Sequence, residues 1–135
     1  MKKILIAVLM CLSILGCKDE TTIKKSSPSV KGVEYVLMNT PNDATITLTF
    51  SGEDNRYFGK VLNNYFGSYE MQNNGSLHLS GAASTMMAGP RDLMQLEQDY
   101  FIKLSKVIGY EISGDILTLH LSDGQTLVYK KKVSQ

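Results

Sequence analysis

One long amphipathic stretch limits what this chain can fold into, because the sequence around it is patterned for short β-strands. The stretch at about 90–107 and the residue that follows it carry apolar side chains that fall within a sector about 140° wide at the period of an α-helix. These are Leu93, Leu96, Tyr100, Phe101, Leu104, Val107 and Ile108. Pro90 suits the first helical position, where its missing N–H would be unpaired in any case. A single such helix needs a sheet to cover its apolar face.

The strand signals are alternating apolar and polar residues bounded by turn formers. In Ala44–Phe50, three large apolar residues alternate with three threonines, which is typical of a half-buried strand. Asn74-Gly75 predicts a type I′ hairpin, since both central residues need positive φ. We expect further strands over 33–38, 57–62, 68–72, 76–80, 111–113, 116–121 and 126–131, with a bend at 63–67.

These patterns predict one small α+β domain that is mainly β. The expected architecture is an antiparallel sheet or cracked barrel of about seven strands packed around one amphipathic helix at about 90–107. Roughly a hundred residues are enough for a single core and no more.

The N-terminus has the pattern of a lipoprotein signal peptide. Two lysines precede an apolar run of twelve residues, 4–15, which is too short for a bilayer that takes about 20. The run ends in Ile14-Leu15-Gly16-Cys17, a lipobox pattern, although an ordinary signal peptide with an incidental cysteine would look similar. We expect residues 1–16 to be the signal peptide, 17–32 a tether lipidated at Cys17, and 33–135 the folded domain.

This pattern predicts an outer membrane lipoprotein of the cell envelope that contacts the membrane through the lipids on Cys17. Lys18-Asp19-Glu20 is similar to a surface-export tag of some Gram-negative lipoproteins, but it also suits a solvated tether, so either face of the membrane stays open. Removing Lys2 and Lys3 changes the formal charge from +1 to −1, and no long basic run follows. Nucleic acid is therefore not an expected partner.

Few residues in the folded part suggest chemistry. Cys11 leaves with the signal peptide, so no thiol is free for catalysis, zinc or a disulfide. Five methionines could in principle bind a soft metal, but we interpret them as core filler, and we expect neither metal nor cofactor. They are Met38, Met71, Met86, Met87 and Met94. A hydrolase could be drawn from Ser84, Asp92 and either His78 or His120, but no G-x-S-x-G motif is present and both histidines alternate with leucines, so we expect them to face solvent.

Glu97 stands out because it lies inside the apolar stripe of the predicted helix. Burying a bare carboxylate costs several kcal/mol, so this one needs hydrogen bonds or a counter-charge. One interpretation is a catalytic acid or base with a raised pKa. The alternative, which we favour, is a buried acceptor that ties the helix to backbone amides of the loop Ser84–Ala88.

Four motifs occur in the order found in one family of bacterial proteins. They are Asn63-x-Tyr65-x-Gly67-x-Tyr69, Thr85-x-Met87-Ala88, Glu97-x-x-Tyr100-Phe101-x-x-Leu104 and Val107-x-x-Tyr110-x-Ile112-x-Gly114-Asp115. Over about residues 44–130 the chain thus resembles the META domain family, which includes heat-shock lipoproteins of the bacterial envelope. The resemblance implies a small antiparallel sheet with a helix and no established catalytic residues. It marks Asn63, Gly67, Tyr69, Thr85, Met87 and Glu97 as a structural motif.

The chain departs from the family pattern at two positions. Many members carry cysteines where this sequence has Leu62 and Gly89. Their joint loss is what we expect if the two cysteines form a disulfide in those relatives, a bond typically worth about 2–4 kcal/mol. Here packing has to replace that bond. We expect Met87 to pack inward beneath the helix, Met86 to be partly exposed, and Ser84 and Thr85 to donate to Glu97.

Two functions follow from the resemblance. The first is a monomeric, membrane-anchored envelope lipoprotein whose non-enzymatic domain has a stress-related role or binds an envelope protein. The alternative is a binder of lipid or another hydrophobic ligand, as in the secretin pilotins that META domains are reported to resemble. The alternative needs an internal apolar cavity. The first is favoured if the core is filled by Phe50, Leu79, Met87, Phe101 and Leu104.

Overall fold

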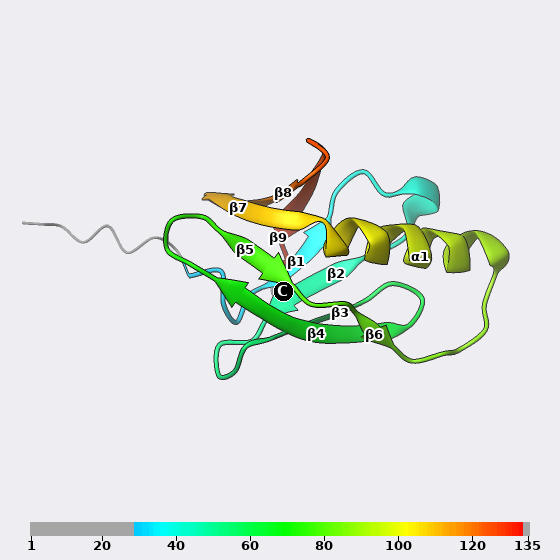
Figure 1. Cartoon of the computed structure of the whole chain (residues 1–135). Helices are drawn as coiled ribbons and strands as arrows, with labels where there is room; N and C mark the ends of the chain where they lie inside the picture. The colour runs from blue at the N-terminus through cyan, green and yellow to red at the C-terminus, as the bar shows by residue number, and fades with distance from the viewer. Residues whose placement is uncertain (1–28, 134–135) are drawn as a thin grey trace, which may run out of the picture.

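The structure is a computed structural model that describes residues 29–133. The predicted signal peptide, Cys17 and the tether as far as residue 28 lie outside these residues. Strands and helices follow in this order (Figure 1): β1 (Glu34–Leu37), the 3-10 helix η1 (Pro41–Asp43), β2 (Thr47–Phe50), β3 (Arg56–Lys60), β4 (Asn64–Met71), β5 (Leu77–Leu79), β6 (Ala83–Ser84), α1 (Arg91–Ser105), β7 (Val107–Ser113), β8 (Ile116–Leu121) and β9 (Thr126–Lys131).

The strands form one antiparallel sheet that curls until its ends meet. Its order is β5-β4-β3-β2-β1-β9-β8-β7, and β6 pairs with the first part of β4. The end strands β5 and β7 approach at the bridge between Ser76 and Gly109, where the Tyr110 amide donates to the Gly75 carbonyl at 2.9 Å. This nearly closed barrel with one α-helix confirms the predicted α+β, mainly β class.

The helix closes the remaining gap. Its buried residues Glu97, Tyr100 and Leu104 face the barrel, and Tyr100 reaches both Tyr65 of β4 and Tyr129 of β9. The helix was predicted to begin at Pro90 and begins one residue later, at Arg91. It ends at Ser105. The predicted amphipathic helix is therefore confirmed, with α1 lying across the barrel interior.

Several predicted boundaries were wrong. The bend predicted at 63–67 lies at residues 61–63 instead, because β4 begins at Asn64 and runs through Gly67. Val107 starts β7 directly after α1, so it is buried by the strand's alternation, while Ile108 points outward and is exposed. The short β6 lies where no strand was expected.

The predicted tether also extended too far. Val30 is buried in the core, and the Gly32 amide donates to the Phe50 carbonyl at 2.7 Å. The last residues assigned to the tether, 30–32, thus belong to the folded domain. A lone valine among serines and lysines gives no periodic signal, so only its tertiary contacts place it inside.

The barrel interior holds a chain of tyrosine hydroxyls. Tyr65 donates to the Thr47 carbonyl at 2.5 Å, Tyr65 and Tyr100 hydroxyls lie 3.0 Å apart, and those of Tyr100 and Tyr129 lie 2.6 Å apart. A carbonyl can only accept, so the single Tyr65 proton points to Thr47. Tyr100 must then donate to Tyr65, and Tyr129 to Tyr100. Desolvation by burial raises the pKa of all three phenols well above the usual value, so they stay protonated.

Two glycines make room for the aromatic rings that fill this interior. Gly59 lies opposite Tyr65 in the β3–β4 ladder, and a Cβ there would come within 2.0 Å of the Thr47 carbonyl oxygen. Gly67 lies opposite Tyr57, and a Cβ there would come within 2.6 Å of the Tyr57 ring. Each tyrosine covers the glycine across from it, which explains why Gly67 recurs in the motif.

The direction of the hydroxyl chain predicts unequal costs for removing its members. Y129F removes only the first donor, so we expect a loss of about 1 kcal/mol in the free energy of unfolding. Y65F leaves the buried Tyr100 proton without an acceptor, so we expect about 2–3 kcal/mol. Urea titration of both variants measures this.

Y110F is the matched control, because Tyr110 makes only an exposed hydrogen bond to the Gln72 carbonyl at 3.3 Å. It should change the free energy of unfolding by less than about 0.5 kcal/mol. A larger cost for Y129F than for Y65F would mean that the chain of donors runs the other way.

Candidate functional site

The Glu97 carboxylate lies beneath α1, only 7% exposed, against the turn between β3 and β4. Its Oε2 accepts from the backbone amides of Leu62 at 3.2 Å and Asn63 at 2.7 Å, and its Oε1 accepts from Asn63 Nδ2 at 3.0 Å. The prediction of a buried acceptor for backbone amides is confirmed. The predicted partner was wrong, since the amides come from Leu62 and Asn63 and not from Ser84–Ala88.

Asn63 connects this carboxylate to the segment between β6 and α1. Its Oδ1 accepts from the Met87 amide at 2.9 Å, and its Nδ2 donates to the Met87 carbonyl at 3.3 Å as well as to Glu97. The Thr85 hydroxyl also reaches Asn63 Oδ1, at 3.4 Å, instead of Glu97 as predicted. One side-chain amide therefore joins three parts of the chain: the β3–β4 turn, the approach to α1, and α1 itself.

Met87 works through its backbone, contrary to the prediction that its side chain packs inward. The Met87 side chain is 70% exposed. The Met86 side chain is 97% exposed, which agrees with the prediction that Met86 is exposed at least in part. Asn63 fills the place beneath the helix that was assigned to Met87, because its amide satisfies the buried carboxylate, which a thioether could not do. Nothing in the sequence distinguishes a residue used for its main chain from one used for its side chain.

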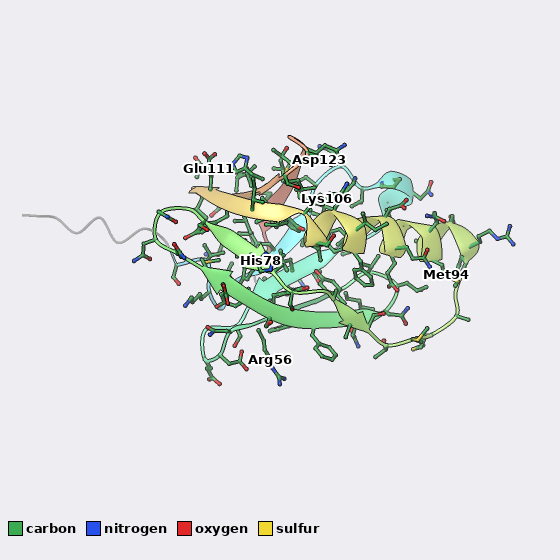
Figure 2. The ribbon with its side chains drawn as sticks, viewed as in Figure 1. Arg56, His78, Met94, Lys106, Glu111 and Asp123 are labelled. Atoms are coloured by element: carbon green, nitrogen blue, oxygen red, sulfur yellow. The ribbon has the colours of Figure 1, made fainter. Side chains whose placement is uncertain are left out.

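Exposed thioethers surround a hollow beside this cluster. Met86, Met87 and Met94 line a space of about 280 Å³ together with Phe101 and Glu97. Met94 extends from the first turn of α1 (Figure 2). We call Met86, Met87 and Met94 the methionine surface. The interpretation of the methionines as core filler was therefore wrong for these three and for Met38, which is also exposed.

The remaining motif residue, Tyr69, is a core residue. Its ring packs edge-on against Phe50 with centroids 5.0 Å apart, and its hydroxyl donates to the Ser51 carbonyl at 2.9 Å. With Asn63, Tyr65 and Gly67 it occupies alternate positions that face the interior of the barrel. The motif around Asn63 is thus the inner face of β4 and the residue that precedes it.

The structure does not unite the residues considered for hydrolysis. Ser84 pairs with Tyr65 in the sheet, His78 lies exposed on β5 (Figure 2), and His120 Nε2 lies 3.5 Å from Glu111. No hydrogen bond joins Ser84, Asp92 or either histidine to another of the four within residues 29–133. In the same part of the chain, no three His, Cys, Asp or Glu side chains cluster as metal ligands. Nor does any helix there have the length and apolar character to cross a membrane.

Comparison with known families decides what these motifs belong to. The family model of the META domain matches residues 28–134, a range that contains every residue that the structure describes. The chain belongs to the META domain family. No curated protein matches the chain.

Solved structures match the fold of this META domain. An NMR structure of a protein from Burkholderia xenovorans has 23% identity and a TM-score of 0.63, over 78% of this chain and 85% of that one. A second NMR structure has 25% identity and a TM-score of 0.57, over 75% and 90% of the two chains. A crystal structure of a DUF4847 family protein from Bacteroides vulgatus has 14% identity and a TM-score of 0.50, over 67% and 60%.

Leu62 and Gly89, the two positions at which the sequence resemblance leads us to expect cysteines, lie side by side. A Cβ built on Gly89 would come within 2.6 Å of Leu62 Cδ2 and 2.8 Å of its Cδ1. The leucine side chain therefore occupies the space beside Gly89 that a larger residue would need. Leu62 also gives its amide to Glu97, so the apolar contact and the polar cluster hold the same junction.

Substitution of Glu97 tests whether this cluster supports the META fold. E97L leaves two backbone amides and Asn63 Nδ2 without their acceptor, so we expect a loss of about 3 kcal/mol or more in the free energy of unfolding. E97Q keeps an acceptor for the backbone amides but sets its own NH₂ against Asn63 Nδ2, so we expect about 1–3 kcal/mol. Thermal unfolding followed by circular dichroism measures both.

D99N provides the control, because Asp99 lies exposed on α1 and accepts only from Gln95 Nε2, at 2.9 Å. Its unfolding free energy should stay within about 0.5 kcal/mol of that of the native chain. If E97L and E97Q unfold at the same temperature as D99N, Glu97 has no structural role.

Proposed function

We propose that the chain is an outer membrane lipoprotein, anchored through acylated Cys17, whose META domain binds an envelope protein and performs no catalysis. The observation that carries the proposal is the methionine surface, which is apolar and exposed and whose Met87 backbone is hydrogen-bonded to Asn63. The lipobox pattern at Ile14–Cys17 supports the anchor. The META domain family is not a known enzyme family.

The buried polar groups of the domain are used by the fold. Asn63 and Glu97 are the buried polar residues among residues 29–133, and they bond to each other and to backbone groups. Throughout the described part of the chain, no buried side-chain nitrogen or oxygen is left without a partner. A carboxylate that already accepts three hydrogen bonds is a structural acceptor, which supports binding over acid–base chemistry at this position.

The methionine surface suits recognition of an apolar side chain on another protein. Thioether side chains are flexible and polarizable, so they adapt to irregular partners, and methionine is common at such surfaces. Asn63 fixes the backbone of Met87, so only side chains need to be ordered when a partner binds. The hollow of about 280 Å³ beside Phe101 gives that partner a place to insert.

Photo-crosslinking in intact cells tests this proposal. A photoreactive residue in place of Met86 should capture one envelope protein, and the same residue in place of His78 should not, because His78 lies exposed on β5 away from the methionine surface. Adding M87D and M94D should reduce capture at least about tenfold, since each buries a charge at the interface.

Both aspartates replace exposed side chains, so thermal unfolding of the M87D/M94D chain should match that of the native chain. Capture that is equal from positions 86 and 78, or unchanged by M87D/M94D, would contradict a role for the methionine surface.

The alternative function, binding of a hydrophobic ligand, finds support in a second hollow. A space of about 370 Å³, partly open to solvent, lies between α1, β9 and the segment after β1. Its apolar lining includes Leu37, Ile46, Leu96 and Leu127, with Asp99 and Lys103 also present. The barrel interior itself is filled by buried Phe50, Leu79 and Leu104 and partly buried Phe101.

Mass spectrometry of the chain purified from membranes distinguishes these possibilities and tests the anchor. We expect a denatured chain that starts at Cys17 and carries acyl chains, and we expect native spectra without a further bound lipid. Retention of a lipid in native spectra, lost when L127W fills the second hollow, would favour the alternative function. A chain without acyl mass on Cys17 would contradict the anchor.

A further inference from the structure

Two phenylalanines lie side by side on the outer face of the barrel. Phe58 of β3 and Phe66 of β4 are direct partners in the antiparallel ladder, and they are 47% and 51% exposed. Both occupy outward positions of strands whose inward residues fill the core. Adjacent exposed aromatic rings on one sheet face mark a surface that meets something apolar.

Cationic residues stand on both sides of this pair. Arg56 and Lys60 flank Phe58 at the outward positions of β3, and their partners on β4 are the uncharged Ser68 and Asn64. On β2, Thr47 is the partner of Lys60 and Thr49 is the partner of Phe58. We call Arg56, Phe58, Lys60 and Phe66 the aromatic face. The positions directly beside these residues on β2, β4 and β6 hold no carboxylate. The next carboxylates on this side of the sheet are Glu70 of β4, two residues past Ser68, and Glu34 of β1, which pairs with Thr49.

A carboxylate close to the aromatic face belongs to Asp54, in the loop before β3. It lies 3.9 Å from Arg56 Nε, and both side chains are more than half exposed. Such an exposed pair is weak, so Arg56 can turn to another anion at little cost. The face therefore combines apolar rings with a positive rim.

This charge pattern argues against a second copy of the chain as the occupant. The rim is positive on both sides of the phenylalanines, so face-to-face pairing of two copies would bring Arg56 and Lys60 against the same cations of the partner copy. Like charges at an interface oppose association. An occupant with negative charges around an apolar layer fits better.

We propose that the aromatic face docks on the anionic phospholipid surface of the membrane, with the Phe58 and Phe66 rings at the level of the headgroups. This rests on the proposed anchor, because the twelve residues from Cys17 to residue 28 reach at most about 40 Å. A domain held that close meets the bilayer constantly. The basic residues attract anionic lipids, and the rings bury apolar area at the interface.

Docking leaves the methionine surface free for a protein partner. Arg56 projects from one side of the barrel, and Met94 lies on α1, away from it (Figure 2). The two proposed surfaces lie on different elements, the outer side of β3 and β4 and the segment from β6 to α1. They adjoin at β6, where Ala83 is the partner of Phe66. Binding to the membrane would orient the domain and present the methionine surface to its partner.

Tryptophan fluorescence tests the docking, since the chain contains no tryptophan. The full chain with its anchor is reconstituted as the F66W variant into phosphatidylglycerol vesicles that carry brominated acyl chains. We expect quenching and a blue shift of the emission, both weaker in phosphatidylcholine vesicles and at high salt. F58W should behave in the same way.

The control is I102W, which places the tryptophan at an exposed position on α1. It should stay unquenched in the same vesicles. Adding R56E and K60E to F66W should lower the docking constant at least about 25-fold, since each basic residue near an anionic bilayer contributes about fivefold. Both substituted residues are exposed, so thermal unfolding of this variant should match that of F66W alone.

Equal quenching of F66W and I102W, or none in anionic vesicles, overturns the proposal. The proposal is also overturned if F66W is not quenched and a photoreactive residue at position 66 captures an acidic envelope protein in cells. The aromatic face would then bind a protein instead of lipid. The denatured mass of the same sample separates this result from failure of the anchor. If Cys17 carries acyl chains but F66W is not quenched, the anchor is supported and the docking is contradicted. If F66W is quenched in a chain without acyl chains, the docking is supported and the anchor is contradicted.

Discussion

A buried carboxylate is the contact on which the arrangement of this domain depends. Glu97 would be costly beneath α1 without donors, and the donors come from the turn that precedes β4. The Asn63 side chain donates the third hydrogen bond to Glu97 and accepts a hydrogen bond from the Met87 amide. These hydrogen bonds fix three segments relative to one another: α1, the β3–β4 turn and the segment before α1. The donors and acceptors are all paired only when the three segments are in place. The exposed segment that carries Met86 and Met87 is therefore tied to the barrel at the Met87 backbone.

The interior shows the same principle with neutral groups. A curled sheet and one helix enclose a space that tyrosine rings fill, and each ring brings a hydroxyl that must be paired. The Tyr129 hydroxyl donates to that of Tyr100, which donates to that of Tyr65. The Tyr65 hydroxyl donates to the Thr47 carbonyl of β2. The rings reach these positions because Gly59 and Gly67 leave space across the ladder. Polar and apolar packing are therefore not separable in this core.

Sequence reasoning succeeded where local pattern decides the outcome. Alternation in Ala44–Phe50 and the helical stripe of 90–107 predicted β2 and α1, and the position of Glu97 within that stripe predicted a buried acceptor. It failed where distant contacts override local preference. Gly67 favours a turn in isolation, yet inward packing against Tyr57 draws it into β4. The pairing of Asn63 with Glu97 is likewise a contact between residues far apart in the sequence. The outward direction of Met87 follows from those contacts, so no periodicity could reveal it.

The contact of Leu62 with Gly89 has a consequence for how this domain matures. The junction that other members are inferred to close with two cysteines is closed here by a branched apolar side chain against a bare backbone. Residues 29–133 contain no cysteine at all. Folding of the domain therefore requires no oxidant or disulfide isomerase, and its stability does not depend on the thiol redox potential of its surroundings. The domain therefore keeps its fold under reducing conditions that open disulfide bonds.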